Sequence, residues 1–296
     1  MQDKNNTSTP QEPIQIGFLH PGEMGSAMAK VIQRNGAIAL WASEGRSSGT
    51  AARAAAAGMR DVGTLEDLCR QCDVIISICP PHAAIDVAKA TAACGFDGAY
   101  VDANAISPST AIQIADIVAQ SGATYTDASV VGPAPDGKRQ TFIYFSGDAA
   151  ESIANYFNAE ALTVELLGPS RSLASALKIC HSAMQKGALA LLFTTLAAAE
   201  HYGVRAPLES LWAMRPETNP LISDIEQSPR IAAKSWRFAG EMLEVADAFA
   251  AVGLPSALFQ GARDVYQRCA APTRGQSLGS IEALISTLLN HGNHRE

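Results

Sequence analysis

Lysine occurs twice in a long segment that is otherwise almost free of charge. Residues 173–202 read LASALKICHSAMQKGALALLFTTLAAAEHY, with lysines at 178 and 186. The composition predicts a buried helix, roughly 45 Å long at 1.5 Å per residue. Burying a lysine is costly unless the amine is paired, solvated in a cleft or partly neutral, and a readily neutral amine can move protons. Lys178 is therefore a candidate general acid or base; the alternative is a stem lying along apolar surface with its ammonium in water.

Three further polar residues fall on the helical face of Lys178. They are His181, Ser182 and Gln185. Residues three, four and seven positions apart neighbour one another on a helix, so these side chains are expected to project together. Such a face offers a proton-transfer group with hydrogen-bonding neighbours.

Composition and charge narrow the class of protein. The 296 residues are 47% hydrophobic and 17% charged, which is typical of a well-buried globular chain with two domains. The formal net charge of -7 argues against a nucleic-acid or anionic-membrane partner. The first thirteen residues are polar and no apolar run reaches about 18 residues, so we expect a cytoplasmic protein with a small-molecule partner.

The cysteines predict neither a disulfide framework nor a metal site. The six lie at 69, 72, 79, 94, 180 and 269, several of them inside apolar segments, which fits reduced thiols in a core. Cys69 and Cys72 have the spacing of half a zinc site or a redox motif. A structural zinc site needs four ligands and no second pair completes this one, so we expect no metal.

Strands and helices alternate in the first half of the chain. Strands are expected at 14–19, 38–41, 74–79, 100–102, 124–127, 141–146 and 162–167, and helices at 49–57, 64–69, 83–93, 109–121 and 151–157, with a further helix from the glycine turn to Gly36. This alternation predicts a doubly wound parallel sheet, whose ligand lies at the carboxyl ends of the strands.

Beyond Gly168-Pro169 the pattern becomes helical. Helices are expected at 173–202, 208–214, 229–238, 241–252, 256–271 and 278–289. We therefore divide the chain into a tail at 1–13, a Rossmann-type nucleotide-binding domain at 14–168, an all-α domain at 169–290 joined to it by the long helix, and a tail at 291–296.

A glycine turn follows the first strand. The sequence GFLHPGEMG places Gly22 and Gly25 where a dinucleotide fingerprint has its second and third glycines, with His20 in place of the first. A turn of this kind is often only structural, since glycine is common wherever a turn requires it. Its position between a strand and a helix favours the nucleotide interpretation, with contacts from His20, Pro21, Gly22, Glu23, Met24 and Gly25.

The end of the second strand indicates which nucleotide binds. An acid at this tip holds the ribose 2′-hydroxyl of NAD, whereas arginine beside serine favours the 2′-phosphate of NADP. The segment reads Ala42-Ser43-Glu44-Gly45-Arg46-Ser47. We expect Ser43, Arg46 and Ser47 to bind NADP, with NAD as the alternative and an ordinary solvated turn as the non-functional explanation.

Taken in order, the motifs GFLHPGEMG, DANAIS, DASVVGP and LKICHSAMQKG resemble those of the β-hydroxyacid dehydrogenase family, which includes 6-phosphogluconate dehydrogenase. The likeness covers nearly the whole chain and is greatest with a phosphogluconate-dehydrogenase-like branch that carries a second lysine and a glycine, here Lys186-Gly187. It implies an NAD(P)-dependent oxidoreductase acting on a secondary alcohol or ketone.

The resemblance also implies roles for single residues. Lys178 matches the catalytic lysine and His181 a substrate-binding histidine, while Asn104 matches a loop near both nicotinamide and substrate. Cys79, Pro80 and Pro81, after the strand at 74–79, correspond to the nicotinamide ribose region.

Two departures leave the substrate open. Ser182 replaces an asparagine of the family, and Val131-Gly132-Pro133 replaces Ser-Gly-Gly, which removes a hydroxyl and backbone donors for a carboxylate. Lys186 and Arg237 are candidate replacement contacts for an anionic substrate; surface salt bridges are the alternative for both.

We also retain an imine reductase and a non-catalytic NADP(H) sensor as alternatives. Lys178 argues against both, because imine reductases commonly have another residue there and a sensor needs no lysine. The apolar stretches 189–199 and 241–252 predict a homodimer.

Overall fold

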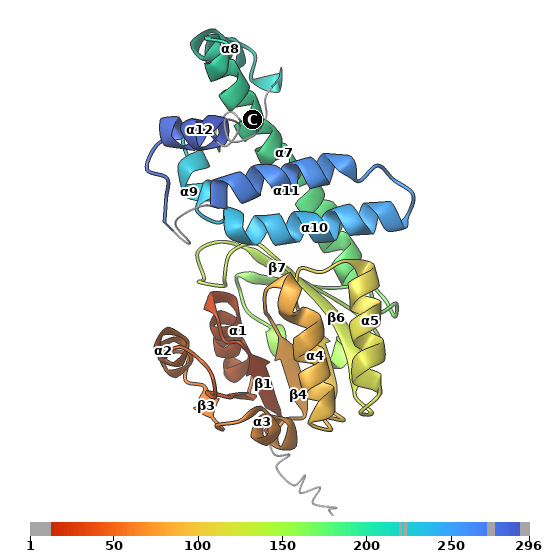
Figure 1. Cartoon of the computed structure of the whole chain (residues 1–296). Helices are drawn as coiled ribbons and strands as arrows, with labels where there is room; N and C mark the ends of the chain where they lie inside the picture. Colours follow the sequence, from red (N-terminus) through yellow and green to blue (C-terminus); the bar gives the residue numbers. More distant parts are fainter. Residues whose placement is uncertain (1–12, 219–220, 222–223, 271–275, 291–296) are drawn as a thin grey trace, which may run out of the picture. The chain divides into compact units, whose positions relative to one another are not determined.

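The computed structural model describes residues 13–218, 221, 224–270 and 276–290, which form two compact units (Figure 1). The sheet unit contains residues 13–79, Ala83–Asn104 and Thr110–Ser175. The helical unit contains Pro80–His82, Ala105–Ser109 and the described residues from Ala176 onward. Apart from Pro13, the tails expected at 1–13 and 291–296 lie outside the described residues.

The sheet unit is built on a mostly parallel eight-stranded sheet of order β3-β2-β1-β4-β5-β6-β7-β8. β1 pairs in parallel with both β2 and β4, so Ile16 lies between Ala39 and Val74. Only the pairing of β6 with β7 is antiparallel among these strands. The strands are β1 (Gln15–Leu19), β2 (Ile38–Trp41), β3 (Arg60–Asp61), β4 (Val74–Ser77), β5 (Ala99–Asp102), β6 (Thr124–Val131), β7 (Thr141–Ser146) and β8 (Leu162–Leu166). The expected Rossmann-type doubly wound sheet is confirmed.

Helices follow the strands as the alternation predicts. They are α1 (Glu23–Arg34), α2 (Ser48–Ala56), α3 (Leu65–Gln71), the short η1 (Pro81–Ala83), α4 (Ala84–Ala93), α5 (Pro108–Ala119), α6 (Ala150–Ala154) and η2 (Asn155–Phe157). The sequence patterns missed β3, because its two residues are both exposed and carry no apolar run. The expected strand at 124–127 is longer than predicted and continues to Val131.

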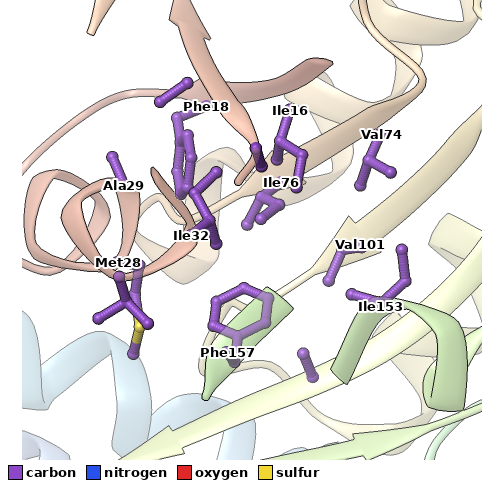
Figure 2. Packing of buried hydrophobic residues seen from close by; sticks show 14 of the residues in the cluster. Ile16, Phe18, Met28, Ala29, Ile32, Val74, Ile76, Val101, Ile153 and Phe157 are labelled. Atoms are coloured by element: carbon purple, nitrogen blue, oxygen red, sulfur yellow. The ribbon is translucent and has the colours of Figure 1, made fainter. Parts of the chain in front are cut away.

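One face of the sheet packs against α1, α6 and η2. Alternate residues of the strands, Ile16, Phe18, Val74, Ile76 and Val101, meet Met28 and Ile32 of α1 and Ile153 and Phe157 (Figure 2). Strands buried on both faces are nearly continuously apolar, as in IALW and VIIS. At Gly17 an added Cβ would lie 2.8 Å from Cys72 Sγ and 3.1 Å from Leu68, so β1 and α3 approach closely because this residue has no side chain.

The helical unit consists of α7 (Leu173–His201), whose first three residues belong to the sheet unit, and of shorter helices after it. These are α8 (Arg205–Met214), η3 (Pro216–Thr218), α9 (Ser228–Ala232), α10 (Ser235–Ala251), α11 (Ala257–Ala270) and α12 (Ile281–Asn290). The break expected between a helix at 229–238 and a helix at 241–252 was placed wrongly; it lies between α9 and α10, at residues 233–234. α10 runs through Gly240, since a helix interior tolerates a single glycine at a cost of about 1 kcal/mol.

One face of α7 provides much of the helical unit's core. Ala190, Phe193 and Leu196 belong to one buried cluster with Met242 and Val245 of α10 and with residues of α11 and α12. A Cβ on Gly187 would stand 3.6 Å from the ring of Phe259, so α11 packs close to α7 at this point. The small residues of α7 therefore permit close helix packing.

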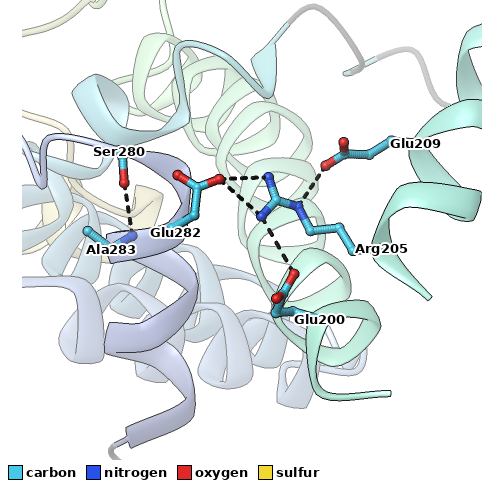
Figure 3. Close-up of polar contacts among 6 residues, drawn as sticks. All are labelled: Glu200, Arg205, Glu209, Ser280, Glu282 and Ala283. Carbon is cyan, nitrogen blue, oxygen red and sulfur yellow. Dashed lines mark hydrogen bonds and ion pairs between the residues drawn. The ribbon is translucent and has the colours of Figure 1, made fainter. Parts of the chain in front are cut away.

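Arg205, the first residue of α8, links α7, α8 and α12. Gly203 adopts a φ of +70° at the turn, and α8 begins at Arg205. The guanidinium contacts Glu209 at 2.8 Å, Glu282 of α12 at 3.3 Å and Glu200 of α7 at 3.6 Å (Figure 3). Because the carboxylates are largely exposed, each pair contributes at most about 1 kcal/mol. The cluster positions α8 more than it stabilises the fold.

Candidate functional site

The glycine turn begins α1 as the fingerprint predicts. Gly22 is the N-cap of α1, and its N–H donates to the carbonyl of His20 at 2.6 Å. An added Cβ on Gly22 or Gly25 would have the His20 carbonyl as its nearest neighbour, at 3.9 and 3.6 Å. Space therefore remains above Gly22, and the N-terminal amides of α1 suit a phosphate. Pro21 is buried behind the turn, whereas Glu23 is exposed.

His20 occupies the first glycine's place in a left-handed conformation. Its φ is +64°, and it is the one non-glycine residue with positive φ among the described residues. Its Nδ1 is buried and has no hydrogen-bond partner among the described residues. Burial, and then the nearby charge of Arg46, lower the pKa of His20 to about 4. The imidazole is therefore neutral at physiological pH.

Arg46 and His20 line one small cavity of about 190 Å³ at the carboxyl ends of β1 and β2. Its wall also includes Phe18, Leu19, Ala42, Glu44 and Leu65. The backbone N–H of Arg46 donates to the Ser43 carbonyl at 3.0 Å. Ser47 caps α2 by accepting from the N–H of Thr50 at 3.2 Å. The cavity thus has a cation and a neutral imidazole at the place where the strand-tip argument puts the adenosine end of a nucleotide.

Asn104 ties the ends of β4 and β5 together. Its Oδ1 accepts from the N–H of Cys79 at 2.6 Å, and its Nδ2 donates to Ser77 Oγ at 3.1 Å. Asp102 accepts from the backbone N–H of Asn104 at 2.9 Å. Asn104 is buried, and burial raises the pKa of the neighbouring Cys79 thiol to about 12. The amide therefore fixes the two loops that follow these strands, a structural task that the sequence motif did not indicate.

Val131, Gly132 and Pro133 form the turn that leaves β6. Gly132 has a φ of +120°, and a Cβ there would lie 3.1 Å from the Gln140 carbonyl. Thr141 Oγ1 donates to the carbonyl of Pro133 at 2.7 Å. This turn therefore requires glycine for backbone reasons alone.

Lys178 begins a row of polar side chains along α7 in the helical unit. Ser182 and Lys186 follow it at spacings of four residues and are both buried, whereas Lys178 is half-buried. Lys186 Nζ donates to Ser182 Oγ at 3.2 Å. The row therefore places two amines on one side of the helix with a hydroxyl between them.

Glu241 of α10 is the acid that faces this row. Its carboxylate forms a buried ion pair with Lys186, and its other oxygen lies 3.4 Å from Arg237 Nε. Lys186 Nζ and Arg237 Cζ stand 5.3 and 5.8 Å from the centre of the Phe238 ring. Two cations thus contact one carboxylate. Burial raises the pKa of Glu241, but the charges of Lys186, Lys178 and Arg237 outweigh it and lower this pKa.

The environment of Lys178 makes its amine easier to deprotonate than that of a free lysine. Burial lowers the pKa of Lys178 to about 8, and the charge of Lys186 acts in the same direction. Glu241 raises this pKa and Arg237 lowers it. The amine is therefore mainly protonated at pH 7 but loses its proton within the range in which enzymes work.

His181 and Gln185 do not share the buried row with Ser182. Both are exposed and line an apolar groove of about 630 Å³ on the helical unit. Burial and then the charges of Lys178 and Lys186 lower the pKa of His181. The face expected to project as one set is therefore split, with Lys178 between a buried polar side and an exposed apolar one.

The predicted site residues fall into local groups within each unit. The sheet unit holds two such groups, one of His20, Gly22, Gly25 and Arg46 and one of Cys79 and Asn104. The helical unit holds a third, made of Lys178, Ser182, Lys186 and Arg237. Pro80 and Pro81 follow Cys79 and belong to the helical unit. Glu241 was missed, although an acid four residues after Arg237 in an apolar helix was a usable signal.

Among the described residues, no group of three or more His, Cys, Asp or Glu side chains is placed to hold a metal ion. Within the same residues, no helix has both the length and the apolarity needed to span a bilayer.

A glycine turn at the carboxyl edge of a doubly wound sheet is the architecture of a dinucleotide-binding fold, to which this chain adds a helical unit. The NAD binding domain of 6-phosphogluconate dehydrogenase matches residues 15–167, and a domain of unknown function, DUF1932, matches residues 199–269. The first match covers more than half of the chain, which therefore belongs to the 6-phosphogluconate dehydrogenase-like family. The resemblance inferred from the motifs is confirmed.

Individual relatives agree with this family. Glyoxylate/succinic semialdehyde reductase 2 of Arabidopsis thaliana is 30% identical over 139 residues, which cover 42% of this chain and 37% of the relative. A conserved protein described as structurally similar to 3-hydroxyacid dehydrogenases matches with a TM-score of 0.63 at 27% identity, over 88% of this chain and all of that one. A 3-hydroxyisobutyrate dehydrogenase of Salmonella typhimurium shares the fold, with a TM-score of 0.66, 20% identity and coverage of 92% and 99%.

Proposed function

We propose that this chain is an NADP-dependent oxidoreductase that interconverts a secondary alcohol and a ketone, with Lys178 as the general acid and base. The observation that carries the proposal is a half-buried lysine whose pKa is lowered to about 8, in a chain whose other unit has the family's dinucleotide fold. A bound nicotinamide supplies or accepts the hydride, and the protein moves the proton. The family membership supports a dehydrogenase or reductase without naming its substrate.

The glycine turn and the cavity beside it fit a dinucleotide. Gly22 and Gly25 leave room for a pyrophosphate near the amides of α1, together with Pro21, Glu23 and Met24. Arg46 supports a 2′-phosphate, with Ser43 and Ser47 in the same turn. We assign the nicotinamide end to Cys79, Pro80, Pro81 and Asn104. NADP is our proposal for the cofactor, and NAD is the alternative.

Proton transfer by Lys178 accounts for its environment. During oxidation the neutral amine takes the proton of the alcohol; during reduction the ammonium returns it. The ammonium also stabilises negative charge that develops on the carbonyl oxygen. A pKa of about 8 allows both forms to be populated near neutral pH.

We propose a small anionic hydroxyacid or sugar-acid-like substrate. Lys178 and the half-exposed Arg237 supply positive charge, while His181 and Ser182 supply hydrogen-bonding groups. Asn104, Val131 and Gly132 are the contacts that the family pattern adds. An anion contact by Lys186 would compete with Glu241, whose carboxylate already pairs with this ammonium.

Replacement of Lys178 tests the proposal directly. Lys178→Met should lower turnover by about 100-fold or more, as the loss of a proton-transfer group does, while NADPH affinity stays within a factor of about two. Turnover is followed by NADPH absorbance across a panel of hydroxyacids, sugar acids and keto acids, and binding by NADPH fluorescence. Lys234→Met, at an exposed lysine of the same unit, is the control.

The same panel separates the alternatives. Reduction of cyclic imines by the wild-type chain, and no oxidation of any alcohol, would identify an imine reductase. Tight NADPH binding with no turnover of any compound would identify a nucleotide sensor. Equal turnover of the wild type and Lys178→Met would remove this lysine from the chemistry.

We further propose that the chain is a cytoplasmic homodimer. Most of the apolar side chains of 189–199 that motivated this expectation are buried within the helical unit's own core. Other large apolar side chains remain exposed, among them Met184, Leu191 and Met214. Such surfaces are often covered by a second copy.

A further inference from the structure

The ion pair between Lys186 and Glu241 is buried inside the helical unit. The side chains are 8% and 6% exposed, and Ser182 beside them is also buried. Replacing a buried ion pair by apolar side chains is often neutral or stabilising, so stability is a weak reason for its presence. Its position indicates another role, because Lys186 lies on the same side of α7 as Lys178, two helical turns away.

Titratable and charged groups on two helices interact electrostatically with Lys178. On α7 these are His181 and Lys186, and on α10 they are Arg237 and Glu241. On α10, Glu244 accepts from the backbone N–H of Ser107 at 2.7 Å. From α11, Tyr266 donates its hydroxyl to the Lys186 carbonyl at 2.7 Å, which fixes the helix at this point. Glu241 is thus the acid that pairs with cations among these groups. Its contact with Lys186 is shorter than its contact with Arg237.

We propose that Lys186 and Glu241 are positioning residues for Lys178: their buried ion pair sets the balance of charge on this side of α7, and Lys186 holds the Ser182 hydroxyl, one turn from Lys178, by donating a hydrogen bond to it. The proposal rests on the proposed function, in which Lys178 transfers the proton. Neither residue needs to touch the substrate. Lys186 is committed to Glu241 and Ser182, and its ammonium is buried.

The two charges act on Lys178 in opposite directions. Glu241 raises the pKa of Lys178, and Lys186 lowers it. Removing only the charge of Lys186 leaves the carboxylate to stabilise a protonated Lys178. Removing only the charge of Glu241 leaves Lys186 and Arg237 to repel a protonated Lys178. Removing both should restore a balance close to that of the wild type.

The test measures the titration of Lys178 itself in the full chain without cofactor or substrate. The ¹³Cε shift is followed against pH in protein labelled with ¹³C-lysine, and the Lys178 resonance is the one lost in Lys178→Arg. Lys186→Met should raise the pKa of Lys178 by about one pH unit or more, and Glu241→Gln should lower it by a similar amount. The double variant should titrate within about half a unit of the wild type.

Matched variants keep the test decisive if a single variant is unstable. Lys186→Arg keeps the charge and should leave the titration of Lys178 near that of the wild type. The double variant leaves no unpaired charge from the pair, so it is expected to fold, as circular dichroism will show. A Lys178 titration that is the same in Lys186→Met and Glu241→Gln, or a double variant that shifts as far as either single one, overturns the proposal.

The outcome is separable from that of the proposed function. If Lys178→Met keeps full turnover, the proposed function fails whatever Lys186 does. If Lys178→Met is inactive but Lys186 and Glu241 do not affect the titration, only the present inference fails.

Discussion

At His20 the chain combines two features that are costly in a folded protein. A left-handed backbone costs an L-residue roughly 1–2 kcal/mol, and a buried ring nitrogen without a partner adds to this. Glycine, which the fingerprint has at this position, avoids both. Strain of this kind is often stored at functional sites, and His20 lines the cavity beside Arg46.

Two substitutions separate the backbone of His20 from its ring. His20→Gly and His20→Ala both remove the imidazole, but only glycine accepts a φ of +64° without strain. We expect the glycine variant to exceed the alanine variant by about 1 kcal/mol in free energy of unfolding, measured by urea denaturation. Equal stabilities would show that the turn relaxes and stores no strain.

Arg46 gives a second prediction at this scale. Arg46→Asp should shift the ratio of NADPH to NADH affinity toward NADH by about 10-fold to 100-fold, because a charged hydrogen bond contributes about 1.5–3 kcal/mol. Fluorescence titration with each nucleotide measures the ratio. Arg34→Asp, at an exposed arginine on α1, should leave the ratio unchanged. An unaltered ratio in Arg46→Asp would exclude a contact with the 2′-phosphate.

Sequence reasoning identified single residues better than their partners. Periodicity placed Lys178, Ser182 and Lys186 on one helix, because these spacings are local. It could not pair Lys186 with Glu241, which lies 55 residues away on α10. It likewise found Asn104 but not Ser77, since their contact depends on the alignment of β4 beside β5. Partners across elements depend on packing that local patterns do not encode.

At the scale of elements, the first turn of α7 is fastened to the sheet. Asp127 of β6 accepts from the N–H and hydroxyl of Ser175, at 2.8 and 2.6 Å, and from Ser146 Oγ at 3.2 Å. Ser146 Oγ in turn accepts from the N–H of Ala174 at 3.1 Å. An acid near the N-terminus of a helix satisfies amides that have no partner within it.

The burial of Asp127 predicts a pH dependence of stability. Burial raises its pKa in the folded chain to about 6, above the value of 3.8 expected in the unfolded chain. Between these values the folded state retains a proton that the unfolded state has lost, so stability falls as pH rises toward 6 and is constant above it. The difference corresponds to about 3 kcal/mol.

Comparison with Asp127→Asn isolates this effect from other titrating groups. The free energy of unfolding of the wild type minus that of the variant should fall by about 2.5 kcal/mol between pH 4 and pH 7. Guanidinium denaturation at several pH values measures it. A difference that increases with pH would mean that the carboxylate is better stabilised in the folded chain than in water.

The boundaries of elements were predictable where the pattern is long and regular. The strands β1, β2, β4, β5, β7 and β8 were expected within about two residues, because they are mostly apolar runs with turns on either side. The extension of β6 to Val131 follows from its pairing with β7, and the continuity of α10 through Gly240 from the packing of both flanking segments. Tertiary contacts overrode local signals in both places.

At the scale of the whole molecule, exposed apolar surface is unevenly shared between the units. Most large hydrophobic side chains that the described part of the chain exposes belong to the helical unit. Met184 and Leu191 of α7 are 75% and 65% exposed, and Met214 at the end of α8 is 75% exposed. In the sheet unit, by contrast, the apolar strand residues are buried beneath helices of the same unit. The helical unit is therefore the part that a second copy would cover.

If the proposed dimer uses this surface, charge placed on it should dissociate the two copies. Met184→Glu combined with Leu191→Glu puts two carboxylates on the exposed side of α7, where burying them against a second copy would cost several kcal/mol. We expect light scattering at about 10 µM to give the mass of two chains for the wild type and of one chain for the variant. Ile112→Glu, at an exposed position on α5, should remain dimeric. A wild type that scatters as one 31.0 kDa chain would instead show that the exposed apolar side chains have another role.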